Sequence, residues 1–247
     1  PATAQSISFI YYAPDHVRTW RRSAYIDLGG HDITLGVLDD QDLIIRTYLK
    51  YKFYHIPKAL YGYRIYGQNT WLERNEEIQK NTGKIGAKYY PDLCKRDAEL
   101  RNLSILSLRW KDVKFDINET WPIEDNSVGY LDLTYFVEYG KDILHTMSEA
   151  YRILSDLGTV RIEVPSTDGR GAFQNPLHKS FWNENTFGYF TKKTVAVTGG
   201  NHHIRFQEFF KKTFFPSSYY KAYDIPVTEV MLTAIKGTSR RPKGKDI

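Results

Sequence analysis

The sequence contains very little cysteine and no long apolar run. Cys94 is its one cysteine, so no disulfide can form within the chain, and a reducing, cytoplasmic location is expected. No apolar run approaches the roughly 20 residues that span a bilayer, and the N-terminal residues lack the layout of a signal peptide. No transmembrane segment is therefore predicted. The first residue is Pro1 rather than methionine, so we expect a fragment of a longer protein.

Net positive charge is almost absent outside the C-terminus, because basic and acidic residues nearly balance there. The 247 residues carry a net charge of +5, and the last twelve hold five basic residues and one acidic residue. A nucleic-acid-binding protein usually spreads basic residues over a folded face. The sequence therefore predicts no nucleic-acid partner and a solvated basic tail over residues 237–247. Nucleic-acid binding through that tail ranks last among the hypotheses.

The chain reads as three zones before that tail. Residues 1–72 mix strand and helix signals, and residues 73–99 have polar composition with helical spacing. The second of these zones predicts a connecting helix that breaks at Pro91. Residues 100–236 alternate strand and helix signals, which predicts an α/β domain with a mainly parallel sheet.

Individual elements are predicted within these zones. In the first zone we expect a helix over 39–49 and strands over 53–57 and 61–66. In the third zone we expect strands over 103–108, 128–133, 160–164 and 227–235, and a helix over 145–154 that Asp156-Leu157-Gly158 stops.

An acidic cluster is the sharpest local feature of the first zone. Asp39, Asp40 and Asp42 would repel one another unless they bind a cation, pair with basic groups or supply a base. A negatively charged helix start is the simpler reading. The cluster belongs to an ordered set of motifs: Arg18–Tyr25, Gly29-Gly30-His31-Asp32, Asp39-Asp40-Gln41-Asp42-Leu43 with Arg46, His55-Ile56-Pro57, and Leu60-Tyr61-Gly62-Tyr63-Arg64.

This set resembles the C-terminal third of an inverting family 2 glycosyltransferase with the GT-A fold. The resemblance implies that Asp40 is the general base on the acceptor hydroxyl and that Asp39 is its acidic neighbour. It also implies that Gly29, Gly30 and Arg64 bind the substrate, a glycan or a nucleotide sugar. The nucleotide-binding half would lie upstream, so a nucleotide sugar with a divalent metal is expected only for a full-length enzyme.

The third zone carries a second set of motifs. They are Asp116, Trp121–Val128, Phe136-Val137-Glu138, Met147–Leu154, Gly158, a strand that ends at Pro165, and Asn175-Pro176-Leu177-His178. Together they resemble a class I S-adenosylmethionine-dependent methyltransferase, which implies a Rossmann-like fold and S-adenosylmethionine as cofactor. The resemblance places Asp116 near the adenine and Glu138 beside the substrate pocket, so both are candidate cofactor-binding residues.

His178 has two readings in this zone. A histidine in a loop over the pocket is a candidate general base, and a histidine that only hydrogen-bonds its loop is the alternative. His202-His203 with His178 or His145 lack the spacing of metal ligands, so no metal site is predicted.

The resemblance also has gaps. The predicted first strand is not followed by a glycine-rich loop, and about eight residues separate it from Asp116, which leaves no room for a second strand. We therefore expect part of a bifunctional glycosyltransferase and methyltransferase of surface polysaccharide biosynthesis, with both sites incomplete. The alternative is an inactive remnant that serves as a binding or scaffold module.

Overall fold

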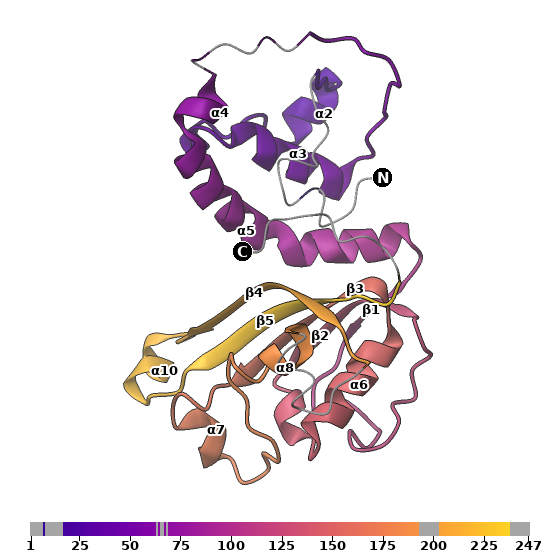
Figure 1. Ribbon diagram of the computed structural model, residues 1–247, viewed down its shortest axis with the longest axis vertical. Coiled ribbons are helices and arrows are strands. Elements are labelled where there is room, and N and C mark those ends of the chain that lie inside the picture. The colour runs from indigo at the N-terminus through magenta and orange to yellow at the C-terminus, as the bar shows by residue number, and fades with distance from the viewer. Residues whose placement is uncertain are drawn as a thin grey trace. The chain divides into compact units, whose positions relative to one another are not determined.

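The computed structural model describes residue 7 and residues 17–62, 64, 67, 69–192 and 203–237. The chain divides into two compact units, residues 1–97 (unit 1) and residues 98–247 (unit 2). Both are traced in Figure 1. The boundary lies within the long helix α5 (Asn75–Leu100). None of the described helices is long and apolar enough to cross a membrane.

The described part of unit 1 is helical. It contains α2 (Arg22–Asp27), η2 (Ile33–Leu35), α3 (Asp39–Lys50), α4 (Thr70–Glu73) and most of α5. The predicted helix over 39–49 is confirmed as α3, whose acidic first turn lies at the positive end of the helix dipole. Its apolar side chains Leu43, Ile44, Ile45 and Tyr48 are buried.

The strand predicted over 53–57 is wrong, because those residues have no regular structure. Extended residues become a strand only when a neighbouring strand completes their hydrogen bonds, and the described part of unit 1 holds no strand. The strand predicted over 61–66 lies partly outside the described residues.

The predicted helix break at Pro91 is also wrong. α5 continues through Pro91 to Leu100. A proline inside a helix removes one backbone hydrogen bond and costs about 3 kcal/mol. Tyr90, Leu93 and Cys94 are buried on either side of the proline, and their burial offsets that loss.

Unit 2 is built around a five-stranded sheet. Its strands are β1 (Ser104–Ser107), β2 (Val128–Thr134), β3 (Leu154–Pro165), β4 (Phe206–Phe214) and β5 (Val227–Ala234), in the order β1-β2-β3-β5-β4. β1, β2 and β3 are parallel, and β5 pairs antiparallel with both β3 and β4. Four of the described strands therefore run in one direction, so the predicted α/β class with a mainly parallel sheet is confirmed.

The crossover between β2 and β3 follows the sequence pattern. It contains η3 (Val137–Tyr139) and α6 (Ile143–Ile153), and Asp142 caps α6 by accepting hydrogen bonds from the backbone N–H groups of Leu144 and His145. The helix buries Met147, Ala150 and Ile153 in the core of unit 2. The short helices α7 (Gly171–Gln174), α8 (Gly188–Thr191) and α10 (Ser218–Ala222) lie in the connections after β3 and β4.

Two features of this sheet differ from the prediction. Asp156-Leu157-Gly158 does not stop the helix, since β3 begins at Leu154 and contains this tripeptide, with Leu157 in the left-handed region at φ 62°. The tripeptide forms an irregularity in the pairing of β2 with β3. The strand β4 was not predicted, because its pairing with β5 also shifts between Glu208 and Phe210 and interrupts the alternation.

One face of the sheet carries charged side chains. Arg161 of β3 forms ion pairs with Glu163 at 2.7 Å, with Glu229 of β5 at 2.8 Å and with Asp132 of β2 at 3.6 Å. The opposite face packs Leu131, Leu133, Val160 and Ile162 into the core with α6. The carboxyl ends of β1, β2, β3 and β4 meet at one edge of this sheet, where a Rossmann-like fold binds its ligands.

Candidate functional site

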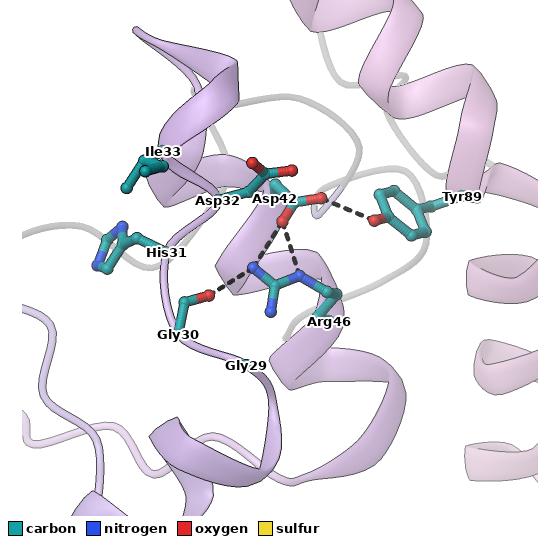
Figure 2. A pocket seen from close by; sticks show the side chains of 8 residues that line it. All are labelled: Gly29, Gly30, His31, Asp32, Ile33, Asp42, Arg46 and Tyr89. Carbon is teal, nitrogen blue, oxygen red and sulfur yellow. Dashed lines mark hydrogen bonds and ion pairs between the residues drawn. The ribbon is translucent and has the colours of Figure 1, made fainter.

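Unit 1 contains a pocket between the turn after α2 and the start of α3 (Figure 2). Its volume is about 430 Å³, which lies in the range of small-molecule sites. Figure 2 shows His31 and Tyr89 on opposite sides of the pocket, with Arg46 and Asp42 between them. The lining residues are Gly29, Gly30, His31, Asp32, Ile33, Asp42, Arg46 and Tyr89.

Two glycines form the wall of this pocket. Gly29 and Gly30 adopt φ values of 79° and 66°, which L side chains rarely adopt. A Cβ on Gly30 would also approach the ring of Tyr25 to 3.0 Å. The sequence therefore folds into this sharp turn because both residues lack a side chain, and the turn places His31 beside the first turn of α3.

Arg46 and Asp42 form the floor of the pocket. Asp42 is buried and accepts hydrogen bonds from Arg46 at 2.6 Å and from the hydroxyl of Tyr89 at 2.7 Å. The Arg46 guanidinium also donates to the carbonyls of Gly30, at 2.8 Å, and of Leu28. Each charge of this pair is therefore satisfied by protein groups, and the pair fixes the glycine turn to α3.

The two carboxylates that the sequence predicts as catalytic lie in the first turn of α3, which also carries the lining residue Asp42. Asp40 accepts hydrogen bonds from Arg18 at 2.6 Å and from the backbone N–H of Gln41 at 2.8 Å. Asp39 contacts Nδ1 of His31 at 2.8 Å. Neither lines the pocket, and the exposed Arg64 does not line it either.

Sequence reasoning assigned no role to most of the lining residues. His31 and Asp32 belong to the Gly-Gly-His-Asp motif, and Asp42 belongs to the acidic cluster. These two motifs could have identified the three residues as part of the pocket. Tyr89 lies 47 residues from Asp42 in the sequence, and no local pattern connects the two.

A second candidate site lies at the carboxyl ends of the parallel strands in unit 2. Trp110 follows β1, Glu138 and Tyr139 follow β2, and His178 lies in the loop after β3. The backbone carbonyl of Glu138 accepts hydrogen bonds from the N–H groups of Lys179 and Ser180, at 2.7 and 3.1 Å. The loop that carries His178 is thereby attached to η3.

Glu138 is the chemically unusual residue of this group. Its side chain is buried, and neither carboxylate oxygen has a hydrogen-bond partner among the described residues. Burial raises the pKa of Glu138 to about 8, because the ionised form loses its hydration. Buried polar atoms without partners are rare in folded proteins, so each one calls for an explanation such as a catalytic role or a bound ion. The carboxyl group is therefore protonated at neutral pH and has no polar group of the described protein to bond with.

Trp110 and His178 contact Tyr139, the residue that follows Glu138 in the chain. Trp110 stacks on Tyr139 with ring centroids 4.7 Å apart, and His178 contacts Tyr139 edge-on at 5.3 Å. The Nδ1 atom of His178 lies 2.9 Å from the carbonyl of Ala172. A carbonyl only accepts, so Nδ1 donates, and Nε2 of the neutral ring is an acceptor.

Asp116 lies in the connection between β1 and β2 and is exposed. Its carboxylate accepts hydrogen bonds from the backbone and side-chain nitrogens of Asn118 at 2.9 and 2.7 Å. These two bonds hold the pKa of Asp116 below its usual value. It is an ionised group at the surface.

S-adenosylmethionine is a cation that carries ammonium and hydroxyl donors, so a site for it needs hydrogen-bond acceptors. The unpartnered buried oxygens of Glu138 fit such donors. The segment after β1 has no glycine; instead, Leu108 donates to the carbonyl of Asp132 at 2.9 Å and Arg109 pairs with the Asp132 carboxylate at 3.0 Å. Glu138 is therefore the residue that fits a donor of the cofactor, whereas the segment after β1 bonds to β2 and supplies no glycine-rich loop.

The described residues hold no cluster of three or more His, Cys, Asp or Glu residues that could bind a metal ion. In the histidine pair considered from the sequence, His202 lies outside the described residues.

Comparisons with known proteins find structural likeness and no sequence match. Neither a protein-family model nor a curated protein matches the chain. A solved complex between the Haloferax volcanii Trm112 methyltransferase activator and the putative methyltransferase gives 15% identity and a TM-score of 0.38, over 59% of this chain and 69% of that chain.

Two further solved structures are similar. A possible histamine N-methyltransferase from Thermotoga maritima, described as S-adenosylmethionine-dependent, gives 16% identity and a TM-score of 0.36 over 58% of this chain and 78% of that chain. A putative type 11 methyltransferase from Sulfolobus solfataricus gives 19% identity and a TM-score of 0.33 over 70% and 98%. Likeness at this level identifies no family for the chain.

Proposed function

We propose that unit 2 binds S-adenosylmethionine at the carboxyl ends of its parallel strands and takes part in methyl transfer. The observation that carries this proposal is Glu138, a buried carboxyl group without partners at the edge where such a fold binds its ligand. The resemblance of residues 115–183 to class I methyltransferases supports the same edge.

Each residue has a stated part in this proposal. Glu138 binds a donor of the cofactor, and the approach of that cation favours the ionised carboxylate. The cofactor supplies an electrophilic methyl group. His178 presents Nε2 as the acceptor of the proton that the methyl acceptor loses, and its Nδ1–H bond to Ala172 fixes the ring. Asp116 contacts the adenine end, as the resemblance implies.

Calorimetry with the full chain tests this proposal. We expect S-adenosylmethionine to bind the wild type and to bind Glu138→Gln about tenfold more weakly, since a hydrogen bond to a charged group contributes about 1.5 kcal/mol. Glu124→Gln is the matched control, because Glu124 is an exposed glutamate of the same unit. Absence of binding at millimolar cofactor contradicts the proposal. Binding without transfer to any acceptor favours a non-catalytic binding module.

We propose a second function, for unit 1. This unit forms the acceptor side of a glycosyltransferase of surface polysaccharide biosynthesis. The observation that favours it is the pocket, whose wall is the Gly29-Gly30 turn of the motif. Asp40 is the proposed base and lies two residues before the lining residue Asp42 on α3, with its carboxylate held by Arg18. The donor nucleotide sugar and its metal belong to the longer enzyme that the resemblance implies.

Nuclear magnetic resonance of the full chain tests the second function. Titration with free glucose, galactose, mannose and rhamnose should shift the amide signals of Gly29 and Gly30 more than those of Gly62, an exposed glycine of the same unit. If none of the four sugars shifts Gly29 or Gly30, the acceptor role of unit 1 is wrong.

A further inference from the structure

His31 lines the pocket of unit 1 and its ring is fixed by its neighbours. The ring lies 5.8 Å from the ring of Tyr25 and 6.4 Å from that of Trp20. Trp20 is itself anchored, since its indole N–H donates to Thr47 of α3 at 2.9 Å. The backbone N–H of His31 donates to the Tyr25 hydroxyl at 3.2 Å. These contacts leave the imidazole little freedom to rotate.

Asp39 sets which ring nitrogen of His31 carries the hydrogen. Its carboxylate lies 2.8 Å from Nδ1. A carboxylate only accepts hydrogen bonds, so Nδ1 is the donor and Nε2 of the neutral ring is left as an acceptor. Nε2 has no hydrogen-bond partner among the described residues, although the ring is about two-thirds buried, with a side-chain exposure of 34%.

The rest of the pocket selects the chemistry of the ligand. Asp42 and Arg46 satisfy each other and, with Tyr89 and the carbonyl of Gly30, leave no unpaired charge on the floor. An anion would meet the carboxylate of Asp32, which is exposed at the rim. An acceptor such as Nε2 in a pocket of about 430 Å³ instead matches a hydroxyl group of a neutral, compact ligand.

We propose that His31 binds a hydroxyl group of a carbohydrate through Nε2, and that Asp39 is the positioning residue that holds its ring in the required tautomer. This inference rests on the proposed acceptor role of unit 1 and adds a binding residue to it. It also assigns to Asp39 an orienting function through His31, distinct from the catalytic one that the sequence implies.

The first experiment measures the tautomer of His31 in the full chain without ligand, by nitrogen-15 magnetic resonance of the ring. We expect neutral His31 to carry its hydrogen on Nδ1. Asp39→Asn should raise the share of the other tautomer, because a neutral amide favours Nδ1–H less than a carboxylate does. An unchanged tautomer in Asp39→Asn overturns the positioning role.

The second experiment titrates the four free sugars into the wild type and into His31→Phe, which keeps an aromatic ring between Trp20 and Tyr25 and removes both nitrogens. The dissociation constant of the sugar that shifts Gly29 and Gly30 most should rise about tenfold in this variant, as for loss of one hydrogen bond. His55→Phe is the matched control, since His55 is an exposed histidine of the same unit outside the pocket.

The outcomes separate the two proposals. If a sugar shifts Gly29 and Gly30 equally in the wild type and in His31→Phe, the acceptor role stands and the role of His31 is wrong. If no sugar shifts these glycines in the wild type, both are wrong. A loss of binding in His31→Phe that also occurs in His55→Phe overturns the assignment to His31.

Discussion

The carboxyl group of Glu138 makes the stability of unit 2 depend on pH. Its folded-state pKa of about 8 lies above the ordinary value of 4.5. Between these two values the unfolded chain releases the proton while the folded chain keeps it, so the free energy of unfolding falls as pH rises through this window.

We therefore predict that Glu138→Gln matches the wild type in stability near pH 4 and is more stable at pH 8. The expected difference at pH 8 is a few kcal/mol, since one pKa unit corresponds to about 1.4 kcal/mol. Urea unfolding at both pH values measures it. If the difference in the free energy of unfolding between wild type and variant is the same at pH 4 and at pH 8, the raised pKa is wrong.

A single methyl group at Gly30 should distort the pocket of unit 1. Gly30→Ala places a side chain in the left-handed region, 3.0 Å from the Tyr25 ring. We predict a loss of about 1–3 kcal/mol in the free energy of unfolding, the usual cost of such strain. Gly62→Ala is the control, because a Cβ there meets nothing within 4 Å. Equal stability of the two variants in urea would rule out strain at Gly30.

At the scale of single residues, the sequence identifies candidate site residues better than it identifies the residues that they contact. The sequence identified the glycine pair and the aspartate pair as candidates because each pair lies within a contiguous motif; these residues are Gly29, Gly30, Asp39 and Asp40. The contact of Asp39 with His31 and the pairing of Asp40 with Arg18 depend on the turn that brings separate segments together. The missing partners of Glu138 could not be predicted, because burial of one side chain is a property of the whole unit.

At the scale of elements, Arg161 connects three strands through its carboxylate partners. Arg161→Met would leave Asp132, Glu163 and Glu229 without this shared cation, in a position where they are largely screened from water. We predict a loss of about 1–3 kcal/mol, because Glu163 loses its ion pair, while Asp132 keeps Arg109 and Glu229 keeps Lys212.

Thermal and urea unfolding check that loss. Arg170→Met is the matched control, since Arg170 is an exposed arginine of the same unit. A variant at Arg161 that unfolds like the one at Arg170 would mean that the ion pairs contribute nothing to the sheet.

The elements that were predicted from sequence are those with local patterns. Helices α3 and α6 and strands β2 and β5 follow periodic apolar residues. The failures at Pro91 and at Asp156-Leu157-Gly158 have one cause, since packing or pairing between distant segments overrode a local breaker signal. The strand β4 was missed for another reason, the interrupted alternation at its register shift. Residues 53–57 are the opposite case. Their sequence has the pattern of a strand, but no described strand of unit 1 pairs with them, so they form none.

At the scale of the whole molecule, each unit has its own buried residues. Unit 1 buries the apolar face of α3, and unit 2 buries the sheet face that α6 covers. We predict that Leu133→Ala in the core of unit 2 lowers the hydrogen-exchange protection of β3 and β5 by about 2–4 kcal/mol, the usual effect of such a cavity. Protection of α3 should stay unchanged.

Mass spectrometry of hydrogen exchange measures both units in one experiment. Ile33→Ala is the control, because Ile33 is 91% exposed. If α3 loses as much protection as β3 in the Leu133→Ala variant, the two units unfold as one cooperative body.

The short strand β1 has a consequence for association between molecules. It pairs on one side with β2, and no described strand pairs with its other side. Such an edge presents free backbone donors and acceptors that can recruit a strand from another chain. β1 spans only four residues and begins and ends in serine. A ladder so short and polar is a poor template for another chain, so the sheet ends there with little tendency to polymerise.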